Sequence, residues 1–299
     1  MKKILLRCAL FGLLIVPLPV ALEILARKLP NVYKEKRDML LSGKDSVEVL
    51  IHGASHFDGR INPHAFEQYA VNFAIIGQSH RYDYLLLKRY IDSLPRLRVV
   101  ILPVGYFHIC YDLERGINPN FICKYQIYSG CSEHGVLSKY SYELGSSTDW
   151  RKAIYNYFRG RYVALGAKGW KDNVPPGFTD DVKRQLLRGT APAAQRAELF
   201  ALNFSYLRQM AELCQRHRVR LLLVSAPVME AYYAGFDKEQ LRLLYVAVDS
   251  LRAGYDNVSY VNYMRDERFV APADFADVSH VSRQGAAKLS AILAEEVKR

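Results

Sequence analysis

The sequence predicts an α/β fold of three layers, α/β/α, in which helices cover both faces of a central parallel sheet. Strand-like and helix-like segments alternate along most of the 299-residue chain. Two of the strand-like segments, 97–104 and 220–228, are nearly continuous apolar runs, which is typical of strands buried on both faces. One aromatic-rich stretch interrupts the alternation and is predicted to be an insertion.

The elements follow in a regular order. Strands are predicted at 47–52, 69–76, 97–104, 220–228 and 258–263. Helices are predicted at 82–94, 197–216, 240–251 and 283–297. In the first helix, Tyr84, Leu87, Ile91 and Leu94 recur at helical spacing, and Pro95 follows its end.

The predicted insertion spans about 106–196 and contains Pro175-Pro176-Gly177. It is too long for a simple crossover between two strands. We expect it to pack over the carboxyl edge of the sheet, where ligands bind in open α/β folds. A structural subdomain without ligand contact is the alternative.

The N-terminus predicts a signal anchor at 1–26, followed by a basic linker at 27–44 and the α/β domain at 45–299. Residues 4–26 are mostly apolar and long enough to cross a bilayer, although their uncharged part alone is too short. No small-residue cleavage site is well placed, so an anchor is favoured over a cleaved signal. The basic residues after the segment favour a cytoplasmic body. The short basic start before an apolar core favours export, and we expect a membrane-anchored, exported (periplasmic or extracytoplasmic) domain.

Charge and cysteine content narrow the function class. Residues 1–37 contribute +6 of the net charge of +11, and no nucleic-acid-binding motif occurs, so no nucleic-acid partner is expected. Five cysteines do not make a disulfide scaffold. Cys110, Cys123 and Cys131 could pair in an oxidising compartment, with the connectivity left open.

A serine follows the first predicted strand, in Gly53-Ala54-Ser55-His56. Ser55 is expected at the carboxyl end of that strand, where a helix would begin. A hydroxyl there is exposed and lies near free backbone N–H groups that can stabilise an oxyanion. Ser55 is therefore a candidate nucleophile, and a helix N-cap is its structural alternative.

A second motif precedes the last predicted helix, where Asp277 and His280 are three residues apart. A serine nucleophile needs an imidazole to take its proton, and the imidazole needs an acceptor that holds its tautomer. The first and last loops of a parallel sheet can meet at its carboxyl edge, so Asp277, His280 and Ser55 are expected to lie together. A surface histidine near a helix N-terminus is the alternative for His280. After the second strand, Gly77 could offer an unobstructed backbone N–H, or it is an ordinary turn glycine.

From about residue 45 onward, these blocks resemble the SGNH (GDSL-like) hydrolase superfamily. VEVLIHGASHFDGRINPHAF, NFAIIGQSHRYDYLLLKRYI and DFADVSHVSRQGAAKLS look like a membrane-anchored group found with bacterial surface-polysaccharide genes. The resemblance implies an SGNH/flavodoxin-like fold with Ser55 as nucleophile. It also implies that Asp277 orients His280, which acts as general base and then acid, and that the N–H groups of Ser55 and Gly77 are oxyanion donors.

The sequence departs from the superfamily in two places. Gly53-Ala54-Ser55 replaces the usual Gly-Asp-Ser, and no Asn follows the third strand, where Pro103–His108 stands. A missing side-chain donor can cost about 3 kcal/mol of transition-state stabilisation. Gln78, beside Gly77, and His108 are candidates for a substitute donor.

The sequence therefore predicts an SGNH-like serine esterase or O-acyltransferase acting on an ester, with an O-acetylated surface glycan as the preferred substrate. The alternative is a catalytically impaired SGNH-fold module that binds glycan or a membrane partner during envelope polysaccharide assembly. Because sugar rings stack on aromatic faces, Trp150 and Trp170 are candidate substrate-binding residues, with a place in the core as the alternative. His56, beside the candidate nucleophile, and His108 are further candidates, and a structural role is the alternative for His56. The histidines show no metal-ligand spacing and no phosphate-binding glycine motif occurs, so neither a metal nor another cofactor is expected.

Overall fold

The computed structural model describes residues 1–15, 17–116, 119–135, 138–146, 149–162, 164–171 and 178–299. The chain forms two compact units, one of residues 1–35 with 119–164 and one of residues 36–118 with 165–299. The predicted insertion at 106–196 is thus divided between the two units. Its Pro175-Pro176-Gly177 segment lies outside the described residues.

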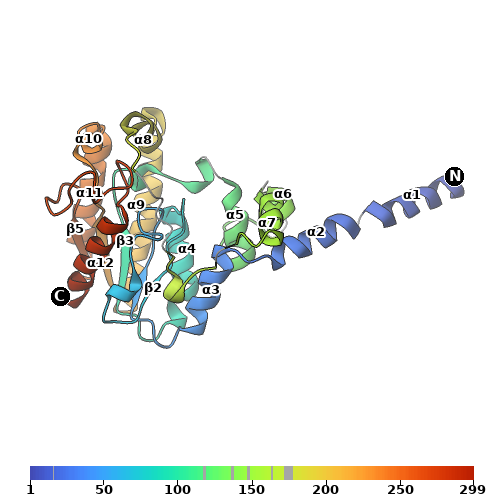
Figure 1. Ribbon diagram of the computed structural model, residues 1–299, viewed down its shortest axis with the longest axis horizontal. Coiled ribbons are helices and arrows are strands. Elements are labelled where there is room, and N and C mark those ends of the chain that lie inside the picture. The colour runs from blue at the N-terminus through green and yellow to red at the C-terminus, as the bar shows by residue number, and fades with distance from the viewer. Residues whose placement is uncertain (16, 117–118, 136–137, 147–148, 163, 172–177) are drawn as a thin grey trace. The chain divides into compact units, whose positions relative to one another are not determined.

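The second unit is built on a parallel sheet that has five strands among the described residues (Figure 1). This confirms the predicted α/β class with a central parallel sheet. Each observed strand lies inside a predicted one, and all neighbouring pairs are parallel. The spatial order is β2 (Ala70–Asn72), β1 (Val49–Ile51), β3 (Val99–Pro103), β4 (Arg220–Ser225) and β5 (Val258–Asn262).

Helices fill the connections between these strands, as predicted. The helix expected at 82–94 is α4 (His80–Tyr90) followed by a short 3-10 turn at Ile91–Ser93. The other three predicted helices are also present, extended by one to four residues at their ends. These three are α9 (Ala193–Arg216), α11 (Lys238–Gly254) and α12 (Arg283–Lys298). Apart from those of the first unit, three further helices of the described residues were not predicted: α3 (Val32–Ser42), α8 (Val182–Gly189) and α10 (Glu230–Tyr233).

The core of this unit lies on both faces of the sheet. Because side chains alternate along a strand, Val49 and Ile51 share one face with Val99 and Ile101. That face packs with buried residues of α12, including Leu289, Leu293, Ala294 and Val297. The helix α9 packs against β4, α4 and α11.

The turn after β1 is tied to α12. Phe57 and Ile61 lie in the same buried cluster as Leu289 and Leu293 of α12. The Asn62 N–H donates to Ser290 Oγ at 2.9 Å. These contacts bring the turn that carries Ser55 beside the helix that the Asp277–His280 loop precedes.

The carboxyl ends of β1 and β3 approach each other closely at Gly53. Gly53 has φ of 120°, and a Cβ there would lie 2.2 Å from Pro103 Cγ. Both the positive φ and the missing Cβ therefore require glycine at this position. The turn containing Ser55 begins directly after this contact.

The first unit contains α1 (Lys2–Ile15), α2 (Pro17–Lys28), α5 (Ile122–Lys124), α6 (Glu143–Ser146) and α7 (Asp149–Phe158). The Glu23 carboxylate accepts hydrogen bonds from the Glu143 and Leu144 N–H groups at 3.1 Å each, which ties α2 to the start of α6. None of the helices in the described ranges combines the length and apolarity needed to cross a membrane.

Cys110, Cys123, Cys131 and Cys214 are buried. Cys110 and Cys214 are free thiols. The Cys123 thiol donates to the Asn120 carbonyl oxygen at 3.0 Å, and the Cys131 thiol donates to the Ser129 carbonyl oxygen at 3.4 Å.

Candidate active site

Ser55 and His280 meet at the carboxyl edge of the sheet. Ser55 lies in the turn after β1, and its Oγ is 2.9 Å from His280 Nε2 although the two residues are 225 positions apart. The first helix after Ser55 is separated from it, because residues 55–60 form turns. Ser55 is therefore not a helix N-cap residue, and its hydroxyl instead contacts the His280 imidazole.

Asp277 holds the other side of the His280 ring. His280 Nδ1 lies 3.0 Å from both carboxylate oxygens of Asp277. Because an anionic carboxylate only accepts, Nδ1 carries the proton, and Nε2 is left with a lone pair for the Ser55 hydroxyl. The geometry is that of a nucleophile, a base and a group that orients the base.

The loop itself supplies further donors to Asp277. Its Oδ1 accepts from the Ser279 N–H at 2.8 Å, the Ser279 hydroxyl at 3.0 Å and the His280 N–H at 2.9 Å. Sequence reasoning assigned no role to Ser279, although it stands between the two residues of the motif. Ser279 helps to fix the carboxylate in place.

The hydrogen bonds at Asp277 outweigh its burial. Desolvation raises the pKa of this carboxyl, but the hydrogen bonds and charge of His280 and the donors of Ser279 lower it to about 2. Asp277 is therefore an anion across the physiological pH range, as an orienting group must be.

Because its pKa is depressed in the folded state, Asp277 should stabilise the protein in a pH-dependent way. The stabilisation is fully present above the unfolded-state pKa of about 4 and is lost as pH falls through about 2. The difference in unfolding free energy between the wild type and Asp277→Asn should narrow by about 1 kcal/mol from pH 6 to pH 3. Urea unfolding at several pH values measures it, and a difference that stays constant over this range would contradict the assignment.

Two backbone amides stand in the neighbouring loops after β1 and β2. Within the described part of the chain, neither the Ser55 nor the Gly77 N–H has a hydrogen-bond acceptor. The loops that carry them are joined, since the Ile75 N–H donates to the Gly53 carbonyl oxygen at 2.9 Å. The side chain of Gln78 is buried, and its Nε2 donates to Asp83 at 2.5 Å.

Two further histidines stand beside the His280 ring. The His56 ring stacks on it with centroids 4.4 Å apart, and the His108 ring meets His56 edge-on at 4.9 Å. Burial, and then the charges of His280 and His108, hold the pKa of His56 well below its usual value. Burial and the charge of His80 lower the pKa of His108 to about 3. Both rings are neutral at physiological pH.

A small cavity of about 30 Å³ adjoins these rings. Its lining includes His56, Gly105, Phe107, His108 and Met264. His56 connects this cavity with the catalytic pair, since it follows Ser55 in the chain and its ring stacks on His280. Ser55 and His280 themselves are not among the residues that line the cavity.

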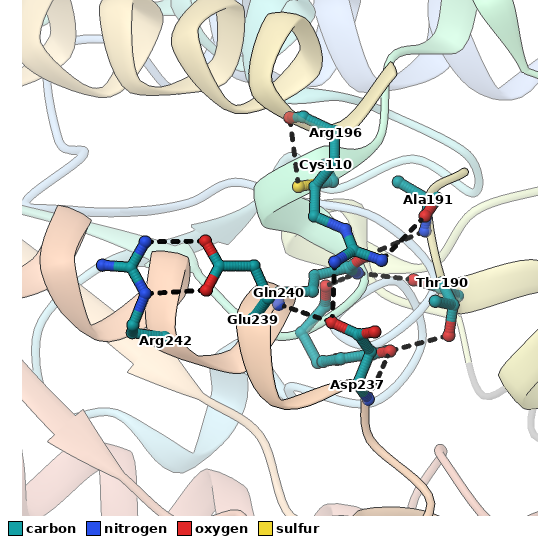
Figure 2. A network of polar contacts seen from close by, with 10 residues as sticks. Cys110, Thr190, Ala191, Arg196, Asp237, Glu239, Gln240 and Arg242 are labelled. Carbon is teal, nitrogen blue, oxygen red and sulfur yellow. Dashed lines mark hydrogen bonds and ion pairs between the residues drawn. The ribbon is translucent and has the colours of Figure 1, made fainter. Parts of the chain in front are cut away.

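A polar network fixes the wall of this cavity (Figure 2). Gln240, near the start of α11, donates through Nε2 to the carbonyl oxygens of Tyr106 at 2.6 Å and Gly189 at 2.7 Å, and its Oε1 accepts from the Ala191 N–H at 2.8 Å. The Tyr106 ring stacks on Phe236 with centroids 3.9 Å apart. These contacts hold the segment after β3, which carries His108, against α11 and the end of α8.

The two tryptophans are placed differently. Trp150 lies on α7 in the first unit, half-buried, with the Arg151 guanidinium 5.3 Å from its ring centroid. Trp170 lies in the second unit and is also half-buried. Their proposed contact with substrate stays a prediction. Within the described ranges, no cluster of three or more His, Cys, Asp or Glu side chains could hold a metal ion.

No protein-family model matches the chain, and no curated protein matches its sequence. Its structure is similar to a GDSL-like lipase from Bacteroides thetaiotaomicron, with TM-score 0.45 and 13% identity over 90% of this chain and 98% of that one. It is also similar to an acetylxylan esterase from Geobacillus stearothermophilus, with TM-score 0.39 and 12% identity over 85% of this chain and 94% of that one. Similarity this weak carries no argument about function, so the proposal below depends on the side-chain geometry alone.

Proposed function

We propose that the chain is an SGNH-like serine esterase or O-acyltransferase. The 2.9 Å contact between Ser55 Oγ and His280 Nε2, with Asp277 on the far side of the ring, carries the proposal. A hydroxyl held against an imidazole nitrogen that has a lone pair can lose its proton as it attacks a carbonyl carbon.

The reaction follows from these three side chains. Ser55 Oγ bonds to the ester carbonyl carbon while its proton passes to His280 Nε2, and the negative charge on the carbonyl oxygen faces the Ser55 and Gly77 N–H groups. When the tetrahedral intermediate collapses, the ester C–O bond breaks and the leaving alkoxide takes the proton from His280. Water or a sugar hydroxyl then attacks the acyl-Ser55 ester, gives its proton to His280, and the acyl group leaves as the acid or as a new ester. Ser55 recovers its proton from His280.

The cavity favours a short acyl group. Its volume of about 30 Å³ holds one or two water-sized groups, so we place a short acyl group such as acetyl in it. We expect kcat/KM on an activated octanoyl ester to be at least about 10-fold below that on the acetyl ester, since the extra methylenes find no room. Met264→Ala, which enlarges the cavity, should bring kcat/KM on the octanoyl ester closer to that on the acetyl ester. Equal rates on both esters would contradict the assignment of this cavity to the acyl group.

The preferred substrate is an O-acetylated surface glycan, and the site of action is the exported side of a membrane. Apolar side chains on α1 and α2, including Ile4, Phe11, Leu13 and Leu18, are largely exposed and would be covered by a bilayer. The full chain should therefore sediment with membranes, and a version lacking residues 1–26 should not. A full-length chain that stays in the supernatant would contradict the anchor.

The direct test of function is turnover of an activated acetyl ester by the full chain. Hydrolysis, or transfer to an added oligosaccharide hydroxyl, supports the enzyme. A folded protein that binds acetylated oligosaccharide without turnover would instead identify a catalytically impaired binding module.

A further inference from the structure

Besides Ser55, Asp277 and His280, the second unit contains a buried cluster of three imidazoles and one carboxylate. It lies in the second unit, where α4 begins and where β1 and β3 end, and the reaction above does not use it. Its members are all at most 6% exposed: His52, His80, Asp83 and His108.

Asp83 is the charged centre of this cluster. Its Oδ2 lies 3.3 Å from His80 Nδ1, its Oδ1 lies 3.6 Å from His52 Nδ1, and it accepts from Gln78 Nε2. Burial raises the pKa of the Asp83 carboxyl, but the hydrogen bonds and charges of His52 and His80 hold it below its usual value. A fully buried carboxylate needs hydrogen-bond donors or a neighbouring positive charge. Among the described residues its ion-pair partners are these two imidazoles, and His80 is the closer.

His80 contacts Asp83 through Nδ1, which leaves its Nε2 on the other side of the ring. The Nε2 atoms of His80 and His108 are both buried and have no hydrogen-bond partner among the described residues. The two ring centroids are 5.9 Å apart, and the role of His108 proposed below requires a hydrogen bond in which His80 Nε2 donates to His108 Nε2. Because His108 is neutral and carries one ring proton, that proton then resides on Nδ1.

The Nδ1 of His108 lies on the side of the cavity. His108 and Gly105 both line it, and a Cβ added to Gly105 would sit 3.5 Å from His108 Nδ1. The absent side chain of Gly105 leaves the space before Nδ1 open. An acyl group placed in this cavity brings its carbonyl oxygen near the ring.

We propose that His108 is a further catalytic residue, whose Nδ1–H donates a hydrogen bond to the substrate carbonyl oxygen as negative charge develops there. Asp83 and His80 are positioning residues that hold His108 in this tautomer. The assignment rests on the proposed function, and it supplies the side-chain donor that the absent Asn after the third strand would have given.

Kinetics of single variants on an activated acetyl ester test the role of His108. His108→Ala should lower kcat by about 10²-fold to 10³-fold with little change in KM, because the lost interaction forms only in the transition state. His108→Asn, which restores an N–H donor, should recover most of that loss. Gly105→Ala keeps the imidazole and covers Nδ1 with a methyl group, so it should lower kcat without lowering the melting temperature. An unchanged kcat in a folded His108→Ala protein would overturn the proposal.

A spectroscopic measurement separates this proposal from the proposed function. Nitrogen-15 NMR of the ring nitrogens should show His108 as the Nδ1–H tautomer in the wild type. Asp83→Asn removes the charge that holds His108 in this tautomer. This variant should therefore show more of the Nε2–H tautomer of His108 and a lower kcat. A wild type that shows His108 as Nε2–H overturns the donor role even if the ester is hydrolysed. A wild type that shows Nδ1–H but neither hydrolyses nor transfers the acetyl group overturns the proposed function and with it the catalytic role of His108.

Discussion

Replacing Ser55 by alanine is expected to lower kcat/KM on an activated acetyl ester by about 10⁴-fold or more, leaving only the rate that the oxyanion donors and the binding site support. Ser55 Oγ is the one atom of the triad that forms a bond to carbon, so no neighbour can replace it. The half-buried hydroxyl contributes little to the fold, because its hydrogen-bond partner is the His280 ring. Ester hydrolysis and urea unfolding, measured on the same preparation, check both statements.

Ser250→Ala is a matched control for this change. Ser250 is exposed on α11, and its loss should leave the rate and the unfolding free energy unchanged within about 0.5 kcal/mol. If Ser55→Ala retained the wild-type rate, the nucleophile would be a different residue.

Asp277→Asn is expected to lower kcat by about 10⁴-fold while the fold persists. The asparagine keeps the shape of the side chain, but its amide donates where the carboxylate accepted. His280 Nδ1 would then accept, the ring proton would move to Nε2, and no lone pair would remain for the Ser55 proton. Steady-state kinetics on the acetyl ester measure the loss.

Asp249→Asn provides the matched control, because Asp249 is exposed on α11 in the same unit. It removes the same charge and should leave kcat within about two-fold. A loss of similar size in both variants would indicate an effect of net charge, and the orienting role of Asp277 would not stand.

Much of the second unit was predictable because its strands are buried apolar runs. The run at 97–104 and the run at 220–228 became β3 and β4, and β3 pairs with β4 along its full length. The segment at 69–76 was predicted as a longer strand than β2 (Ala70–Asn72). An apolar run reports burial, whereas a strand also requires an extended backbone paired in register with its neighbour.

The site was predictable only where its residues follow one another in a motif. Asp277 and His280 share one loop, and Ser55 follows a strand, so chemistry and position together pointed to them. His80 and Asp83 lie three residues apart on one helix, which is a spacing common to many helices. Their proximity to His108 arises only in the folded chain, so the sequence did not reveal it. The grouping of 119–164 with the N-terminal residues likewise depends on contacts between distant segments that no local pattern encodes.

The central claim is that Ser55 is a nucleophile activated by His280. Mass spectrometry of the full chain after treatment with a fluorophosphonate tests it directly, followed by mapping of the modified peptide. We expect one adduct for each chain, on Ser55, formed far more slowly in His280→Ala. A folded wild-type protein that remains unmodified, or that carries its adduct on another residue, would contradict the claim.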